Sequence, residues 1–300
     1  MRRLLGILII AAFVLLTGCK ELFKEVKAEV ETKEKVQENA FHVPSSWVAK
    51  RVAKAKTKLN STDAGKIVWK AMEAHGGLEN WYGNGPLSFR FNYQPLDTTK
   101  AQRDSYQTID IWSNKAKHTS VADSTAHFGW TGKIAWVQGD STAFAYDTKF
   151  WALTPIYFLG QPFILDGEGV NLERLANTVY KDTSQDVIKV TFDAGTGDAP
   201  DDYYILYFQE DTHLLSAIRY IVSYPAYFKD GGHLPEKFME VLGAETVDGI
   251  NFPTSYKTYW LTADEKPGAY ITKIDVSDIK FEQQLSKDFF KVPNGARIIE

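Results

Sequence analysis

Leu87-Ser-Phe-Arg-Phe-Asn-Tyr93 (LSFRFNY) is the stretch at which the sequence changes its period. Every second residue is apolar or aromatic and falls on one face of an extended chain: Leu87, Phe89, Phe91 and Tyr93. The polar residues between them fall on the other face. This alternation is typical of a half-buried β-strand, because successive side chains of a strand point to opposite sides. It predicts that the chain is built of strands from residue 87 onward.

The same alternation recurs along the rest of the chain. It is found over residues 105–112, 115–122, 133–138, 142–147, 186–193, 203–209, 214–223, 237–246, 250–260 and 270–281. Tight polar turns such as Ser113-Asn114 and Asp248-Gly249 join many of these segments, and such short links make consecutive strands antiparallel neighbours. The pattern predicts a mainly β (α+β) domain with a meander of about ten strands, enough for a barrel, a half barrel or a sandwich.

Two helices are expected before the sheet. Ser45-Ser46 are placed to cap a short helix that runs to about Leu59, and Ser61-Thr62-Asp63 precede an apolar-periodic run over residues 64–77. This second run ends in two glycines, which suit a helix C-terminus. His75 lies in its last turn, where a histidine suits the negative end of the helix dipole better than it indicates catalysis.

One apolar segment interrupts the meander. Residues 150–167 (FWALTPIYFLGQPFILDG) carry a single charged side chain, that of Asp166. Pro155 and Pro162 exclude a central strand and an uninterrupted helix, because each proline lacks a backbone donor. The segment is also too short and too broken to span a membrane. We expect it to lie against the inner face of the sheet, and we call residues 150–167 the plug.

The N-terminus has the pattern of an export signal. Arg2-Arg3 precede the apolar run Leu4–Leu16, and the small residues Thr17-Gly18 lie before Cys19, the only cysteine of the 300 residues. The run is too short to span a bilayer comfortably. The residues Leu16-Thr17-Gly18-Cys19 resemble the lipobox of bacterial lipoproteins. The resemblance implies cleavage before Cys19 and a diacylglyceryl group on its sulfur.

A charged segment follows the cysteine. Residues 20–38 contain five Lys and six Glu and no Gly or Pro, which fits a lightly amphipathic helix or a solvated tether. Loss of Arg2-Arg3 from the 34 basic side chains, against 38 acidic ones, leaves a net charge of about −6. This net negative charge gives no basic surface of the kind that binds nucleic acid. Membrane attachment is therefore expected to come from the lipid on Cys19, since two or three acyl chains anchor a protein stably.

The chain contains no recognisable catalytic or metal-binding motif. Its six histidines form no His-x-x-x-His pair, and no nucleophile elbow or phosphate-binding loop occurs. His118 and His127 lie on neighbouring predicted strands, but a metal pair there is not favoured. Four aspartates in residues 193–202 fit a polar hairpin loop better than a cation site. We therefore expect no enzyme activity, no metal and no cofactor.

Several segments resemble a family of bacterial outer-membrane lipoproteins related to the lipoprotein-carrier and lipoprotein-receptor (Lol-like) fold. They are AMEAHGGLENW (71–81), YFLGQPFILDGEGV (157–170), DDYYILYFQEDTHLLSAIRY (201–220), VDGINFPTSYKTYW (247–260) and FFKVPNGARII (289–299). These are packing and turn motifs. The resemblance implies a curved, incomplete antiparallel barrel wrapped around a helical plug, with an apolar cavity that receives acyl chains in relatives.

We predict a lipoprotein signal peptide over residues 1–18, a charged tether over 19–43 and a single Lol-like β domain over 44–300. By resemblance, Lys20 in place of the Asp that retains lipoproteins at the inner membrane favours the outer membrane of a Gram-negative envelope. The sequence leaves open whether the periplasmic or the surface face carries the protein. It identifies no protein partner and no oligomeric state.

The functional hypothesis is a membrane-anchored lipoprotein that binds a lipid or acyl chain in an apolar cavity, as a component that handles lipids or lipoproteins in the envelope. The aromatic residues expected to line the cavity are Phe89, Phe91, Trp151, Phe158, Phe163, Phe252 and Trp260. The alternative is a structural or glycan-interacting envelope lipoprotein whose core is fully packed. The first hypothesis predicts an interior cavity, and the alternative predicts none.

Overall fold

The computed structural model describes Lys27, residues 43–140 and residues 142–299. The lipidation site Cys19 and the predicted signal peptide lie outside the described residues. Residues 43–282 and 290–299 form one unit, whereas residues 283–289 belong to a second. In this second unit a turn is closed by the Phe289 N–H, which donates to the Ser286 carbonyl at 3.0 Å. Within the described ranges, no helix is both long and apolar enough to cross a membrane.

Three helices precede the sheet: α2 (Ser45–Leu59), α3 (Asp63–Ala74) and α4 (Leu78–Gly83). In α2, Val48, Ala55 and Leu59 are buried, and their spacing of seven and four residues places them on one face. Both predicted helices are confirmed, and Thr62 caps α3 by accepting a hydrogen bond from the Gly65 N–H at 3.0 Å. The cap predicted for α2 is wrong. Its first turn already includes both serines, so Pro44 occupies the cap position without a side-chain bond.

Sixteen strands are described. They are β1 (Leu87–Pro95), β2 (Arg103–Asp110), β3 (Lys115–Ser120), β4 (His127–Trp130), β5 (Ala135–Gln138), β6 (Val170–Arg174), β7 (Thr178–Tyr180), β8 (Thr183–Phe192), β9 (Tyr204–Gln209), β10 (Leu215–Tyr220), β11 (Lys237–Leu242), β12 (Glu245–Val247), β13 (Ile250–Phe252), β14 (Ser255–Leu261), β15 (Pro267–Phe281) and β16 (Arg297–Ile299). Fourteen of them form one sheet, and β12 and β13 form a separate hairpin. The predicted number of about ten is too low because several strands have only three to five residues.

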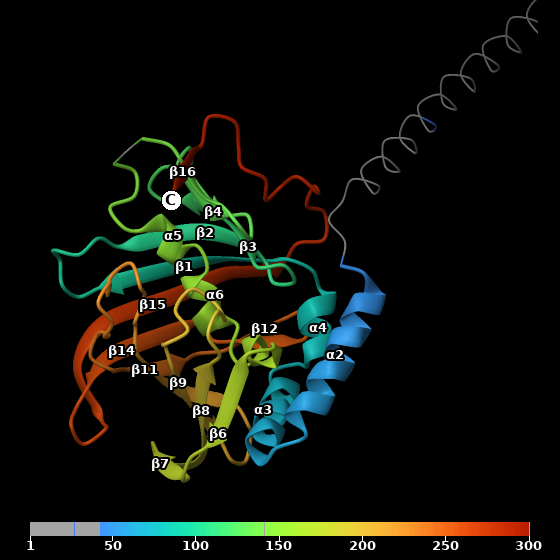
Figure 1. Ribbon diagram of the computed structural model, residues 1–300, viewed down its shortest axis with the longest axis vertical. Coiled ribbons are helices and arrows are strands. Elements are labelled where there is room, and N and C mark those ends of the chain that lie inside the picture. The colour runs from blue at the N-terminus through green and yellow to red at the C-terminus, as the bar shows by residue number, and fades with distance from the viewer. Residues whose placement is uncertain (1–26, 28–42, 141, 300) are drawn as a thin grey trace, which may run out of the picture. The chain divides into compact units, whose positions relative to one another are not determined.

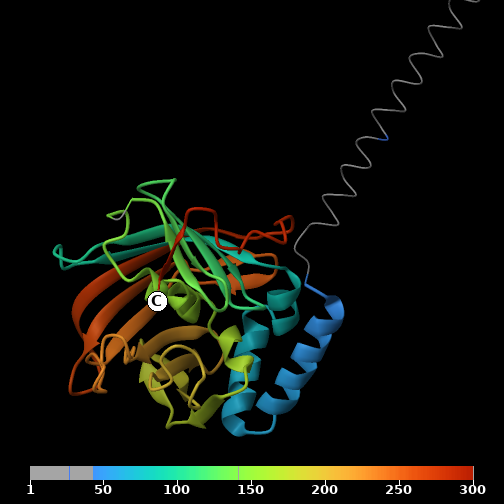
Figure 2. The same ribbon diagram turned by 45° about the horizontal axis from the view of Figure 1, so that its top comes forward.

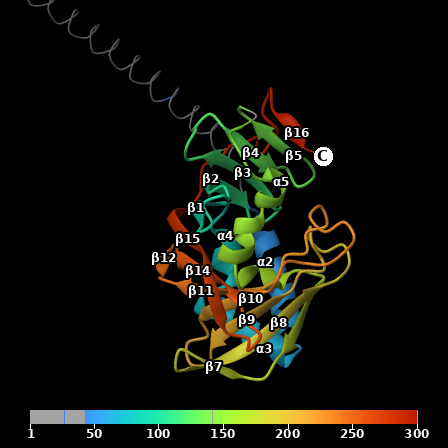
Figure 3. The same ribbon diagram turned by 90° about the vertical axis from the view of Figure 1, so that its left-hand side faces the viewer.

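The sheet is antiparallel at every pairing and open at both ends. Its order is β16-β5-β4-β3-β2-β1-β15-β14-β11-β10-β9-β8-β6, with β7 beside β8. Leu87, Phe89 and Phe91 on β1 are at most 2% exposed, as their alternation predicted. Figure 2 and Figure 3 show the sheet curving around the internal helices. The prediction of a mainly β fold with a curved antiparallel sheet is confirmed, and the described strands do not close into a barrel.

The predicted strand over residues 142–147 is wrong. Its described residues form turns and bends, because β16 from the chain's C-terminal end pairs with β5 and occupies that edge. Phe144 and Tyr146 instead pack against Phe128 of β4, with ring centroids 5.0 and 6.0 Å apart. The alternation in this segment therefore reflects side-chain packing without strand pairing.

The plug lies on the concave face of the sheet. It contains the end of α5 (Thr148–Trp151), all of α6 (Thr154–Leu159) and the 3-10 helix η1 (Phe163–Asp166). Figure 1 shows α5 and α6 against the sheet, while α2, α3 and α4 lie together at one side of it. Most plug side chains are buried, so the plug and the concave face share one core.

Gly76 and Gly77 end α3 and lead the chain into α4. Both have positive φ, and the Gly77 N–H donates to the Met72 carbonyl at 2.9 Å, which is the bonding of a Schellman motif. A Cβ on Gly76 would lie 2.0 Å from the Gly249 carbonyl oxygen between β12 and β13. The turn therefore packs directly on the hairpin and leaves no room for a side chain.

Candidate functional site

A cavity of about 290 Å³ lies between the plug, the concave face of the sheet and the loop over residues 193–202. Its volume is close to the lower end of the roughly 300–1,000 Å³ that small-molecule sites occupy. The hypothesis of a fully packed core predicted no such space.

The walls of the cavity are mainly apolar and aromatic. The sheet contributes Ile109, Phe192, Tyr204 and Tyr220, the plug contributes Ile156, Tyr157, Phe158 and Ile164, and helix α4 contributes Trp81. Phe158 packs against Tyr220 with ring centroids 5.0 Å apart. Burial raises the pKa of Tyr204 and of Tyr157, so both phenols stay neutral at physiological pH. An apolar chain would contact uncharged side chains along this wall.

One side of the cavity is closed by a buried ion pair. Asp166 at the end of η1 accepts hydrogen bonds from Arg51 of α2, at 2.5 Å from Nε and 2.7 Å from Nη2. The Tyr82 hydroxyl donates to the same carboxylate at 3.1 Å. The hydrogen bond to Asp166 raises the pKa of Arg51, and burial raises the pKa of Tyr82. Because all three side chains are occupied with one another, this corner fixes the plug to the helices.

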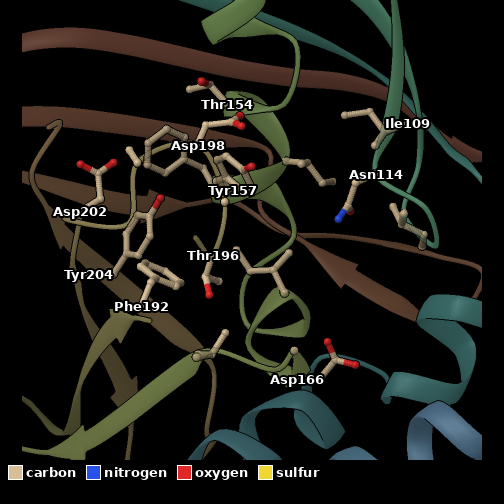
Figure 4. A pocket seen from close by; sticks show the side chains of 18 of the residues that line it. Ile109, Asn114, Thr154, Tyr157, Asp166, Phe192, Thr196, Asp198, Asp202 and Tyr204 are labelled. Atoms are coloured by element: carbon tan, nitrogen blue, oxygen red, sulfur yellow. The ribbon is translucent and has the colours of Figure 1, made fainter. Parts of the chain in front are cut away.

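The opposite side of the cavity is the loop over residues 193–202. Figure 4 shows Asp202 and Tyr204 on this side, away from Asp166. Asp202 accepts two hydrogen bonds from Ser223, 2.6 Å from its N–H and 2.7 Å from its hydroxyl. Burial nevertheless raises the pKa of Asp202. Asp198 is exposed at the same loop, so this side opens toward solvent.

Three of the sequence-predicted cavity residues lie at or near the space. Phe158 is part of the cavity wall. Phe91 and Trp151 line a separate void of about 10 Å³, together with Arg103 and Gln107. Trp151 packs edge-on against Phe150, which belongs to the wall of the larger cavity, at a centroid distance of 5.9 Å.

The other four predicted residues pack elsewhere in the core or at its margin. Phe163 stacks on Trp81 at 4.7 Å, and Phe252 lies 6.1 Å from the same indole. Phe89 is 1% exposed and packs against Phe91. Trp260 is half-buried on β14, beneath the ammonium of Lys237. The structure therefore separates these four from the cavity wall, although all lie near the concave face or the plug.

The histidines have structural environments. His75 is the C-cap of α3, and its ring bonds the Ala71 carbonyl through Nδ1 and the Leu215 N–H through Nε2. Burial lowers its pKa, so it is a neutral cap and not the charged one expected at a helix C-terminus. His118 and His127 do not face each other, because His118 pairs with Phe128 across β3 and β4.

His118 is completely enclosed. Its Nε2 donates to the Ala152 carbonyl at 2.9 Å, and the Ser105 hydroxyl donates to its Nδ1 at 3.1 Å. Burial lowers its pKa to about 4. Across the part of the chain that the structure describes, no group of three or more His, Cys, Asp or Glu side chains is placed to hold a metal ion.

No protein-family model and no curated protein matches the chain. Two solved structures superpose on it with a TM-score of 0.50 each. One is a LolA superfamily protein from Nitrosomonas europaea, 12% identical, with 77% of this chain and 98% of that chain covered. The other is a DUF1329 family protein from Desulfovibrio piger, 14% identical, with the same shares covered. The chain has a LolA-like fold. At these identities the similarity concerns the fold alone, and it confirms the structural resemblance found in the sequence.

Several residues of the LolA-like fold's concave side were missed by the sequence interpretation. The sequence pattern marks Asp166 only as the charge that ends an uncharged stretch, and Arg51 lies 115 positions away from it. Arg103 and Lys237 also face the concave side, each against aromatic rings. The alternation of β2 would have identified Arg103, since every second residue of a strand lies on the same face and Arg103 precedes the inward residues Ser105 and Gln107.

Proposed function

We propose that the protein is a membrane-anchored envelope lipoprotein that holds a lipid or a single acyl chain in the cavity between the plug and the sheet. The cavity of about 290 Å³ with its apolar wall is the observation that carries this proposal. The driving force is the removal of alkyl surface from water, about 0.8 kcal/mol for each buried CH₂. A chain of several carbons is therefore held without a specific polar contact.

The LolA-like fold supports the proposal, since the sequence resemblance implies a cavity of this kind in relatives. We propose Phe158 as a direct contact of the ligand. We propose the remaining predicted aromatics as the packed surround that shapes the cavity: Phe89, Phe91, Trp151, Phe163, Phe252 and Trp260. Their role is to hold the plug and the sheet apart at a fixed spacing.

The proposal includes the way the protein is attached. Cleavage after residue 18 leaves lipid-modified Cys19 at the start of a tether over residues 19–43, followed by the domain over 44–300. The expected location is the outer membrane of a Gram-negative envelope. Mass spectrometry of the full-length gene product extracted from a Gram-negative host tests the lipid attachment, because diacylglycerol on Cys19 adds a defined mass that Cys19→Ala abolishes.

Photo-crosslinking tests the binding activity. The detergent-extracted full chain is incubated with a C16 fatty acid that carries a diazirine on its alkyl chain, irradiated, and mapped by peptide mass spectrometry. Labels are expected in α6 and in the loop over residues 193–202. Ala199 lines the cavity in this loop, whereas Ala194 is exposed and outside it.

The matched pair of variants makes the test specific. Ala199→Trp fills the open side of the cavity and is expected to reduce labelling about tenfold or more, since blocking only two buried CH₂ groups already removes about 1.6 kcal/mol. Ala194→Trp adds the same side chain to the same loop and is expected to leave labelling unchanged. Equal labelling of the two variants, or labels spread over the outer surface, would overturn the proposal.

A further inference from the structure

Two cationic side chains on the concave face of the sheet have no carboxylate bound to them among the described residues. Lys237 begins β11 and lies between two aromatic rings, with its Nζ 5.4 Å from the Tyr220 centroid and 5.5 Å from that of Trp260. Tyr220 and Trp260 are its direct partners in the register of β10 and β14. The ammonium is thus positioned by rings and not by an ion pair.

Arg103 at the start of β2 has a similar environment. Its guanidinium carbon lies 5.1 Å from the Tyr93 ring centroid, 5.0 Å from that of Trp151 and 5.9 Å from that of Tyr146. In the described part of the molecule its Nε is buried without a hydrogen-bond partner, and so are both amide atoms of Gln107. Buried donors of a charged group are rarely left unpaired in a native structure, so this arginine has bonding capacity to spare.

The two cations lie next to the proposed binding cavity. Tyr220, which Lys237 contacts, belongs to the cavity wall. Trp151, which Arg103 contacts, packs against Phe150 of the same wall. Both cations therefore lie within one or two aromatic rings of the space proposed for the acyl chain.

The charges around Lys237 favour an anion. Burial, together with the positive charges of Lys100 and Arg103, lowers the pKa of Lys237 to about 8. Asp202 is the carboxylate that acts in the opposite direction, and its hydrogen bonds already go to Ser223. A negative group near Lys237 and Arg103 would relieve this repulsion and complete both hydrogen-bond sets.

From this arrangement we infer that Lys237 and Arg103 bind the anionic head, a carboxylate or a phosphate, of the amphiphile whose chain occupies the cavity. The inference rests on the proposed function and adds the class of ligand to it. The rings keep water from the cations on one side, and a desolvated charge gains more from a charge-assisted hydrogen bond than an exposed one. The protein would thereby distinguish an anionic amphiphile from a neutral one of equal chain length.

The experiment compares two photoactivatable C16 probes on the detergent-extracted full chain, a fatty acid and the corresponding alcohol with the diazirine at the same carbon. The quantity measured is the ratio of acid labelling to alcohol labelling. Partition into detergent affects this ratio equally in all variants and so cancels. Because hydrogen bonds to charged groups stabilise by amounts equivalent to factors of about ten to a hundred, Lys237→Met and Arg103→Met are each expected to lower the ratio about tenfold or more.

Two controls accompany these variants. Lys189 lies over the Tyr203 ring at 5.7 Å, on the opposite face of the sheet, so Lys189→Met removes a similar cation and is expected to leave the ratio unchanged. Lys237→Arg keeps the charge and is expected to retain most of the preference. This retention shows that loss in Lys237→Met comes from the charge and not from disturbed packing.

The outcomes separate the two proposals. If both probes label the cavity and the ratio is the same in wild type and all variants, the head-group inference is wrong and the binding cavity stands. If neither probe labels the cavity, the proposed function is wrong and the inference falls with it. If calorimetry shows that inorganic phosphate alone binds and depends on Lys237 and Arg103 while the acid and alcohol label equally, the site takes a free anion and the inference is also overturned.

Discussion

The corner formed by Asp166, Arg51 and Tyr82 provides the sharpest test of how the plug is held. Asp166→Ala removes a carboxylate whose side chain is 1% exposed and which accepts three hydrogen bonds. Removal of one partner of a buried ion pair costs about 3–5 kcal/mol. Arg51 retains 34% of its side-chain exposure, so water recovers part of its hydration and we take about 2 kcal/mol for this pair. The unsatisfied Tyr82 hydroxyl adds about 1 kcal/mol.

The expected loss in the free energy of unfolding is therefore about 3 kcal/mol, which corresponds to a fall in Tm of about 6–12 °C for a domain of this size. Urea denaturation of the full chain, followed by tryptophan fluorescence, measures it. Glu168→Ala is the matched control, because this carboxylate lies two residues further and pairs with Lys54 of the same helix, with both side chains more than half exposed. Its expected loss is below about 1 kcal/mol.

A double-mutant cycle completes the test. Replacing both members, as in Asp166→Leu with Arg51→Met, leaves no uncompensated charge. The loss of this double variant is expected to be smaller by about 2 kcal/mol than the sum of the losses of Asp166→Leu and Arg51→Met measured singly. Strictly additive losses, or an Asp166→Ala loss no larger than that of Glu168→Ala, would refute the view that this ion pair fixes the plug.

Three further predictions concern other parts of the fold. Gly76→Ala is expected to destabilise the protein by more than about 3 kcal/mol, because its Cβ would collide with the Gly249 carbonyl. Gly77→Ala has open space around its Cβ and is expected to cost only about 1 kcal/mol. Equal losses of the two variants in urea denaturation would contradict the role of the collision. The pKa of His118 is about 6.5 in the unfolded chain and about 4 in the folded chain, so on acidification protons bind the unfolded state first. The free energy of unfolding therefore falls by about 3 kcal/mol from pH 6.5 to pH 4. His118→Gln should flatten this pH dependence, and an unchanged slope in that variant would exclude His118 as its source. Phe158→Ala should cost about 3 kcal/mol in the absence of ligand, and a loss under 1 kcal/mol would show that this part of the plug is loosely packed.

The alternation along the chain was sufficient to predict the strands that have both a clear period and a local neighbour. β2 and β3 are examples, since both have an alternating pattern and the tight turn at Ser113-Asn114 joins them. β16 could not be predicted in this way, because three residues at the end of the chain pair with β5 about 160 positions earlier. Such pairing depends on the curvature of the whole sheet. The same edge explains why residues 142–147, which have the right alternation, do not form a strand.

The candidate site was predicted only in part for a related reason. Hydrophobicity identifies which residues are buried, but it does not distinguish a wall that faces a cavity from one that faces another side chain. Phe158 and Phe163 lie in the same apolar segment, yet one faces the cavity and the other stacks on Trp81. Arg51, which lines the cavity, and Arg103 and Lys237, which lie next to it, are distant in sequence and share no motif. Their convergence follows from strand register and helix packing.

The size of the cavity leads to a last prediction about ligand and stability. By the slope of about 24 cal/mol per Å³ found for engineered cavities, an empty apolar space of 290 Å³ would cost up to about 7 kcal/mol, which is comparable to the net stability of a typical domain. The cavity opens to solvent near Asp198, which lowers this upper bound, and a bound alkyl chain would add contacts to the apolar wall. Palmitate at one hundred times its Kd should therefore stabilise the full chain by about 2.7 kcal/mol, a rise in Tm of about 5–10 °C. Without palmitate, Ala199→Trp should have a higher Tm than Ala194→Trp, which carries the same change outside the cavity. The Tm of Ala199→Trp should not respond to palmitate. A wild-type Tm that is indifferent to palmitate would mean that the cavity is maintained for some purpose other than an acyl chain.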